Sequence, residues 1–174
     1  MGQGAIRQAV TQAFTDAQFP LVGSVYPARG YISEQDYEMN AAGFYVENDF
    51  GSGCVLVVNL PGPDRRNLFT LTGRTSVNDF NIHPVVVELF FANRAGDPVQ
   101  AQIDYDSVVD AIIPYVRNNP TLSAPEVVWS AGEYQAGVTT QQSTPFTSAD
   151  GTTVFINGVV RFEAWEQIVG PNGV

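Results

Sequence analysis

The sequence predicts an α+β fold in which a mixed, mainly antiparallel sheet packs against an N-terminal and a central amphipathic helix. Apolar residues recur at three- and four-residue spacing over 6–17 and over 104–118, as on one face of a helix. Runs rich in β-branched and aromatic residues, typical of strands, occupy 85–91 and 154–168. A length of 174 residues, with 44% hydrophobic and 15% charged residues, indicates one domain, 1–174, with a packed core.

The first half of the chain predicts several short strands after the N-terminal helix, which Phe19-Pro20 ends. Residues 28–42 are polar and predict an exposed loop. The turn composition of 48–53 suits a hairpin between the strands on either side of it. The segments with strand composition are 21–26, 43–47, 54–60 and 68–72.

The run 85–91 is almost continuously apolar, which predicts a central strand covered by helices on both faces. The polar residues that precede it, up to His83, are interpreted as a connection outside the strand. The turn-forming residues 94–98 follow the strand directly.

The central helix is expected to begin near Asp104 or Asp106, either of which could act as its N-cap, and to end at 118–120. Pro114 lies within this segment. Because proline removes one helical hydrogen bond and crowds the preceding turn, we expect a kink there or an early end.

The last third predicts strands at 126–129 and 154–168, separated by a loop rich in Thr, Gln and Ser, 138–152. Irregular loops of this length are usually functional or mobile, so this loop is the leading candidate for a docking element. The pair Asn157-Gly158 has two interpretations: a two-residue hairpin turn, or a bulge within one long strand.

The composition disfavours several classes of function. The net charge is −10, with eight Arg residues and no Lys, whereas sequence-independent nucleic-acid binding depends on neutralising phosphates. The single cysteine, Cys54, provides neither an intrachain disulfide nor a metal-binding pair. We find no signal-peptide pattern and no run of about 18 apolar residues that could span a membrane. We therefore expect folding in a cytoplasm without membrane contact.

Candidate catalytic residues are few. Cys54 and His83 could form a nucleophile and base pair, but a buried thiol and a loop histidine are the favoured interpretation. Glu47 and Asp49 could share a strand face, and the acids at 104–110 suit a helix N-terminus. The sequence predicts no catalytic, cofactor-binding or metal-binding residue, and a protein that is not an enzyme.

The N-terminal helix is followed in order by the segments 85–91, 95–97, 105–112, 119–122, 131–133 and 160–165. This succession resembles the tail terminator proteins of long-tailed bacteriophages. The resemblance covers most of the chain and offers no catalytic motif to carry over.

The resemblance implies a virion protein, assembled in the host cytoplasm, whose copies form a hexameric ring on the last ring of the tail tube. Such a ring stops tube growth and presents a surface to the head-tail connector protein. An acidic lumen would let DNA pass without specific binding. Other neck, head-completion or tail-tube subunits would share these features, and a small thiol or acid enzyme is a distant alternative.

A ring of identical subunits needs two different complementary surfaces on each copy. We expect Glu88 and Arg94 to contribute to one surface, and Arg65 and Arg66 to the other. The residues of the candidate docking loop expected to contact a partner are Gln141, Gln142, Thr144 and Phe146.

Overall fold

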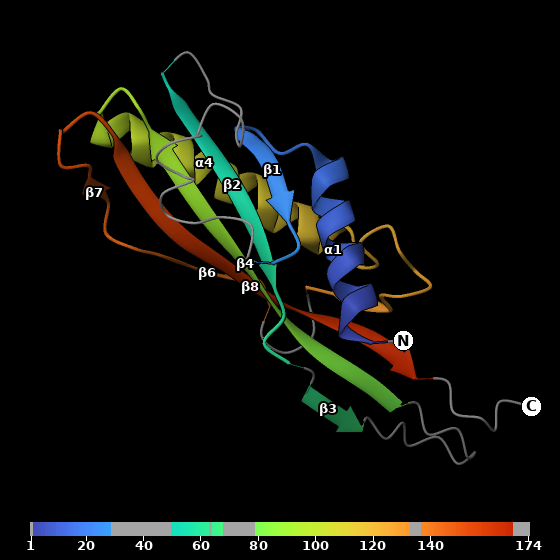
Figure 1. The fold of residues 1–174 in the computed structure, drawn as a ribbon. Helices are drawn as coiled ribbons and strands as arrows, with labels where there is room; N and C mark the ends of the chain where they lie inside the picture. Colours follow the sequence, from blue (N-terminus) through green and yellow to red (C-terminus); the bar gives the residue numbers. More distant parts are fainter. Residues whose placement is uncertain (1, 29–49, 63, 68–78, 133–136, 169–174) are drawn as a thin grey trace, which may run out of the picture.

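The computed structural model describes residues 2–28, 50–62, 64–67, 79–132 and 137–168. In this part of the chain a mixed sheet carries two helices, α1 (Gln3–Ala17) and α4 (Pro98–Asn118) (Figure 1). The α+β prediction with an N-terminal and a central helix is therefore confirmed.

The sheet has the strand order β1-β2-β4-β8, in which β1 runs parallel to β2 and the other neighbours are antiparallel. A short strand, β3, pairs with the beginning of β4, and three others, β5, β6 and β7, pair with β8. The bounds are β1 (Val22–Tyr26), β2 (Ser52–Asn59), β3 (Asp64–Asn67), β4 (Asp79–Asn93), β5 (Ser130–Ala131), β6 (Thr139–Gln142), β7 (Phe146–Thr147) and β8 (Val154–Ile168).

The long pair of β4 and β8 forms the centre of the sheet (Figure 1). Its register runs without a shift from Asp79 opposite Ile168 to Asn93 opposite Val154. Alternate residues of β4 face the helices and are fully buried, whereas Val86, Glu88 and Phe90 between them are half-buried on the other face. The buried residues of this row are Val85, Val87, Leu89 and Phe91.

Two expectations for this strand were therefore wrong. The strand extends beyond 85–91 and includes His83, because fifteen residues of β8 offer it a continuous partner. Helices do not cover both of its faces in the described residues, since α1 and α4 pack in the same core cluster. An antiparallel sheet with one helix layer needs only one fully apolar face.

The two helices contact each other as well as the sheet. The Tyr115 hydroxyl of α4 donates a hydrogen bond to the Ala13 carbonyl of α1 at 2.9 Å. Phe14 of α1 packs edge-on against Tyr115, with ring centroids 6.0 Å apart, and stacks on Phe162 of β8 at 6.2 Å. The apolar stripe of α1 thus closes the core against both α4 and the sheet.

Helix α4 begins earlier than expected. Asp97 is its N-cap and accepts hydrogen bonds from the backbone N–H groups of Val99, at 2.9 Å, and Gln100, at 3.1 Å. Pro98 occupies the first helical turn, where its missing N–H costs nothing and its fixed φ suits the helix. The predicted start near 104–106 was wrong, because this Asp-Pro cap lies within the segment that was interpreted as a turn.

Two positions that were predicted to interrupt a helix or a strand do not end it. Helix α4 continues past Pro114 to Asn118, so the early end is excluded. Strand β8 continues through Asn157 and Gly158 with its register to β4 unshifted. It is therefore one long strand, with neither the hairpin nor the bulge.

The segment before β8 also differs from prediction. Residues 126–129 form the end of a turn and a bend rather than a strand, with β5 immediately after them. The predicted loop 138–152 contains β6 and β7, because the edge of β8 that faces away from β4 offers backbone groups to pair with. The predicted strands 43–47 and 68–72, and nearly all of 28–42, lie outside the described residues; β2 has β1 and β4 as its neighbours.

Gly158 lets α4 approach β8 closely. A Cβ atom at this position would overlap the hydroxyl of Tyr105 and lie 2.9 Å from the Cζ atom of Tyr105. Tyr105 itself is buried and packs edge-on against Phe91 of β4, with ring centroids 5.9 Å apart. The missing side chain thus provides the space that the Tyr105 ring needs.

We predict that Gly158→Ala lowers the free energy of unfolding by roughly 1–3 kcal/mol, because an added methyl group in a packed core forces its neighbours to move. Chemical denaturation followed by circular dichroism measures the difference. Gly4→Ala in α1 is the control: nothing lies within 4 Å of its Cβ, so stability should stay constant or rise. Equal stabilities of the Gly158→Ala variant and the unsubstituted chain would contradict the packing argument.

Candidate functional site

The predicted contact residues lie at separate places on the sheet. Glu88 is in the middle of β4, and Arg94 is exposed in the turn that follows β4. Arg65 and Arg66 are on β3, opposite Asn81 and Phe80 at the start of β4. About 13 residues of an extended strand, about 43 Å, therefore separate the backbone of the arginine pair from that of Arg94.

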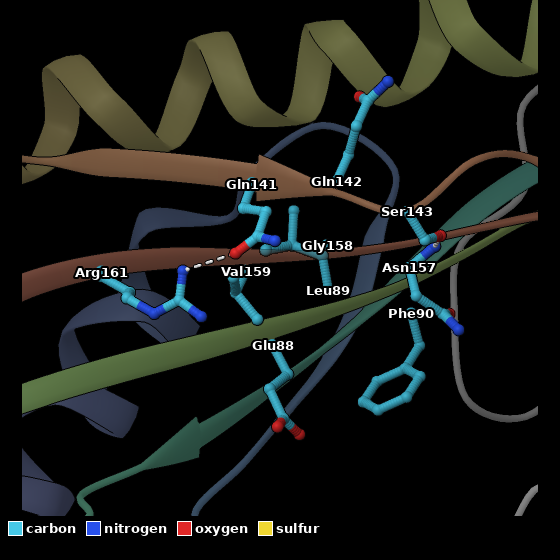
Figure 2. A pocket seen from close by; sticks show the side chains of 10 residues that line it. All are labelled: Glu88, Leu89, Phe90, Gln141, Gln142, Ser143, Asn157, Gly158, Val159 and Arg161. Carbon is cyan, nitrogen blue, oxygen red and sulfur yellow. Dashed lines mark hydrogen bonds between the residues drawn. The ribbon is translucent and has the colours of Figure 1, made fainter.

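A hollow on the helix-free side of the sheet brings two of the predictions together (Figure 2). Glu88 of β4 and Gln141 of β6 are both opposite Val159 of β8, so all three share one row and one face. The volume of the hollow is about 310 Å³. It is lined by Glu88, Leu89, Phe90, Gln141, Gln142, Ser143, Asn157, Gly158, Val159 and Arg161.

The polar groups of the hollow come from three neighbouring strands. Arg161 donates a hydrogen bond from Nη1 to the Gln141 side-chain oxygen at 3.2 Å, as Figure 2 shows. The Ser143 hydroxyl accepts a bond from the backbone N–H of Asn157 at 3.1 Å. Amide, guanidinium and carboxylate groups on one open face suit the polar contacts of a protein–protein interface.

Gln142 points the other way, toward α4 (Figure 2). Its side-chain amide exchanges two hydrogen bonds with that of Gln102, at 3.2 and 3.3 Å. Both residues line the hollow, but their side chains have different partners: that of Gln141 accepts the bond from Arg161, and that of Gln142 fastens β6 to the helix. Thr144 is exposed between β6 and β7.

An aromatic group extends the helix-free face beyond the hollow. Phe146 of β7 stacks on Phe155 of β8, with ring centroids 5.2 Å apart and an interplanar angle of 23°. Phe155 also packs against Ala92 and the half-buried Phe90 of β4. Phe146 is 49% exposed, so one side of its ring faces solvent.

The turn that carries Arg94 is held by buried side chains. Asn93 is fully buried and donates to the Phe50 carbonyl at 3.0 Å and to the Ser52 hydroxyl at 2.9 Å. Its side-chain oxygen accepts a bond from the backbone N–H of Asp97 at 3.2 Å. The positions of Arg94 and of the helix start are therefore fixed relative to β2.

The sequence did not point to Asn157 or Arg161 as residues of the helix-free face. They alternate with core residues of β8. This alternation is visible in the sequence, but the open choice between a hairpin turn and a bulge at Asn157-Gly158 obscured it. The considered Cys54–His83 pair does not form: Cys54 is opposite Phe91, eight residues from His83 along β4, or about 26 Å.

His83 is not a loop residue but a buried one. Its Nε2 atom lies 3.0 Å from Glu166 Oε2, and Asn81 donates to the same oxygen at 3.2 Å. His83 and Glu166 are each 2% exposed. Within the described residues the His83 Nδ1 atom has no hydrogen-bond partner.

The hydrogen bonds at Glu166 determine its ionisation. Burial opposes the charged form, but the hydrogen bonds that the carboxylate accepts, among them those from His83 and Asn81, lower the pKa of Glu166 below its usual value. An ionised Glu166 therefore stabilises the fold at pH values above the unfolded pKa of about 4.3. That contribution is lost as the pH falls through the lower folded-state pKa.

We predict that Glu166→Gln lowers the free energy of unfolding at pH 7 by roughly 1–3 kcal/mol, because it leaves a buried hydrogen-bond network incomplete. The difference from the unsubstituted chain should shrink below about pH 4, where the native carboxylate loses its advantage. Urea unfolding at pH 7 and pH 3 measures it. Glu126→Gln, at an exposed turn position, should change neither value; a pH-independent difference at Glu166 would contradict the prediction.

In the described ranges no group of three or more His, Cys, Asp or Glu side chains could hold a metal ion. The described helices also include none long and apolar enough to cross a membrane. The described residues do present a polar hollow, an exposed aromatic ring beside it, and a turn after β4 that buried side chains hold in place.

Of the comparisons with known proteins, the one with solved structures gives a match. No protein-family model matches the chain, and no curated protein matches it. Among solved structures, the chain is similar to a chain of a structure described as "Virion of native gene transfer agent (GTA) particle". The match has 14% identity and a TM-score of 0.37, and it covers 93% of this chain and 96% of that one. A TM-score below 0.5 assigns neither a family nor a function.

Proposed function

We propose that this chain is a structural, non-catalytic protein of a phage-like particle. Its copies form a ring, expected to be a hexamer, on the head-proximal end of the tail tube. The ring ends tube growth and joins the tail to the head-tail connector protein. Assembly takes place in the host cytoplasm, and the mature location is the tail or neck of the virion.

The observation that carries this proposal is the order of the packed elements. The segments on which the resemblance to tail terminator proteins rests correspond in order to α1, β4, the turn after β4, α4, the turn after α4, β5 and β8; residue 133 lies outside the described residues. These elements pack as one sheet with one helix layer. The helix-free face then remains for contacts, with the hollow and Phe146 on it.

The arrangement of the predicted contact residues supports a ring. β8 pairs with β4 along the whole length of β4 and so occupies one of its two edges. β3 must therefore lie on the other edge, on the same side as β2 and β1. Arg65 and Arg66 are on β3. Gln141 and Gln142 are on the opposite side of the sheet, on β6. A head-to-tail ring requires two different surfaces. Glu88 lies between β2 and β8, in the middle of the sheet, so we propose that β6, expected above to dock a partner, contributes to the second surface in place of Glu88 and Arg94.

The acidic composition supports a passage for DNA. At a net charge of −10, the chain offers few cations to phosphates, so DNA gains little by counterion release from a ring of such subunits. We propose that DNA passes through the lumen without specific binding.

The proposal predicts that the protein caps tail tubes. Tubes assembled from the tail tube protein of the same particle are grown with and without the purified chain and measured by electron microscopy. One ring at one end of each tube, with growth stopped, is the expected result. Further rings added to the tube would favour a tube subunit. A chain that does not bind to tubes would contradict both the terminator role and the tube-subunit role.

A matched pair of variants localises the contact. Phe146→Ser removes the exposed ring from the predicted docking segment and should weaken capping at least tenfold, with little change in melting temperature. Val99→Ser is the control, because Val99 is even more exposed, at 68%, but lies on α4. If the Phe146→Ser and Val99→Ser variants cap tubes equally well, Phe146 is not part of the contact.

A further inference from the structure

On one side the described sheet ends in β1 and, opposite the beginning of β4, in β3; on the other side it ends in β5, β6 and β7, of which β6 is the longest. The two edges considered below are those of β1 and β6. A strand at the edge of a sheet presents backbone N–H and C=O groups that another chain can pair with. Natural proteins commonly protect such edges with charged residues or proline. Neither β1, with the sequence VGSVY, nor β6, with the sequence TTQQ, contains either. The register of β1 to β2 shifts once, between Val22 and Ser24, and is regular from Ser24 to Tyr26.

The side of β1 carries a groove. A cavity of about 530 Å³ is lined by Phe14 and Thr15 of α1 and by every residue of 18–25, which includes the first four residues of β1. None of these residues is charged. On the other side of the sheet, all four side chains of β6 are exposed.

The directions of the two strands are compatible with pairing between copies. β1 is parallel to β2, and β2, β4, β8 and β6 alternate in direction, so β6 runs antiparallel to β1. Rotation about an axis roughly parallel to the strands preserves these directions. The β6 strand of one copy and the β1 strand of the next would therefore meet antiparallel, as in the commoner kind of sheet.

We propose that β6 of one copy enters the groove beside β1 of the next copy and extends its sheet, so that a second copy of this chain is the partner of both edges. The inference rests on the proposed function, since it specifies the contact that builds the ring. Two unlike surfaces generate a head-to-tail contact, which closes into a ring by rotation. Because both edges are uncharged, the contact avoids direct repulsion between subunits that each carry a net charge of −10.

Disulfide cross-linking tests this contact. Ser24 is opposite Val55, and Thr139 and Gln141 are opposite residues of the same helix-free face, so a continued sheet places them on one side. Within one copy, β1 and β6 are four strand spacings apart, about 19 Å, which exceeds the reach of a disulfide. A bond between them must therefore join two copies.

The native cysteine does not interfere. Cys54 is fully buried, and burial raises the pKa of its thiol, so it reacts slowly with oxidants. The two test chains are Ser24→Cys with Gln141→Cys and Ser24→Cys with Thr139→Cys. The control carries Ser24→Cys with Asp110→Cys, which is exposed on α4. Each chain is assembled, checked for rings by electron microscopy, oxidised and separated under denaturing, non-reducing conditions.

We expect at least one of the two test chains to give a ladder of covalent multimers up to the ring, and the control to give at most dimers. Rings that separate into monomers after oxidation of both test chains would overturn the edge contact and leave the ring proposal intact. The unsubstituted chain is assembled in parallel: if it forms no rings, alone or on tubes, the proposed function fails, and the edge contact fails with it.

Discussion

The antiparallel pair of β4 and β8 is the interaction on which the rest of the structure depends. Fifteen residues of each strand pair without a shift, so alternation assigns every residue of both strands to one of two faces. One face receives α1 and α4, and the other keeps Glu88, Phe90 and Arg161. The two remaining strand edges then recruit β2 and β3 on one side and β5, β6 and β7 on the other. A one-residue slip would exchange the core and the open face.

This construction leaves several different surfaces exposed in the described residues. The helix-free face presents hydrogen-bonding groups around a shallow hollow, with the exposed ring of Phe146 beside it. Buried Asn93 holds the turn that bears Arg94, so the backbone of this turn would lose little entropy if it bound a partner. The uncharged edges β1 and β6 lie on opposite sides of the sheet. Such a division of surfaces suits a subunit that contacts copies of itself sideways and other proteins through its face.

The sequence was sufficient to predict the elements that depend on local patterns of residues. The period of the apolar residues gave both helices, and the β-branched run gave the core of β4. The start of α4 was missed because the Asp97 cap and Pro98 also fit a turn. The burial of His83 could not be foreseen, since it depends on Glu166, 83 residues away in the chain. For the site, the sequence named Glu88 and Gln141 but not that they share a hollow, which depends on the pairing of β4, β8 and β6.

The most direct test of this account is the mass of the purified chain in solution, measured by light scattering over a range of concentrations. The account predicts a transition from monomers to one closed species of fixed size, six copies for a hexamer, with no larger product at the highest concentration. A mass that keeps growing with concentration would show open-ended polymers and contradict a closing ring. A mass that stays at one chain throughout, and also in the presence of tail tubes, would contradict self-assembly altogether.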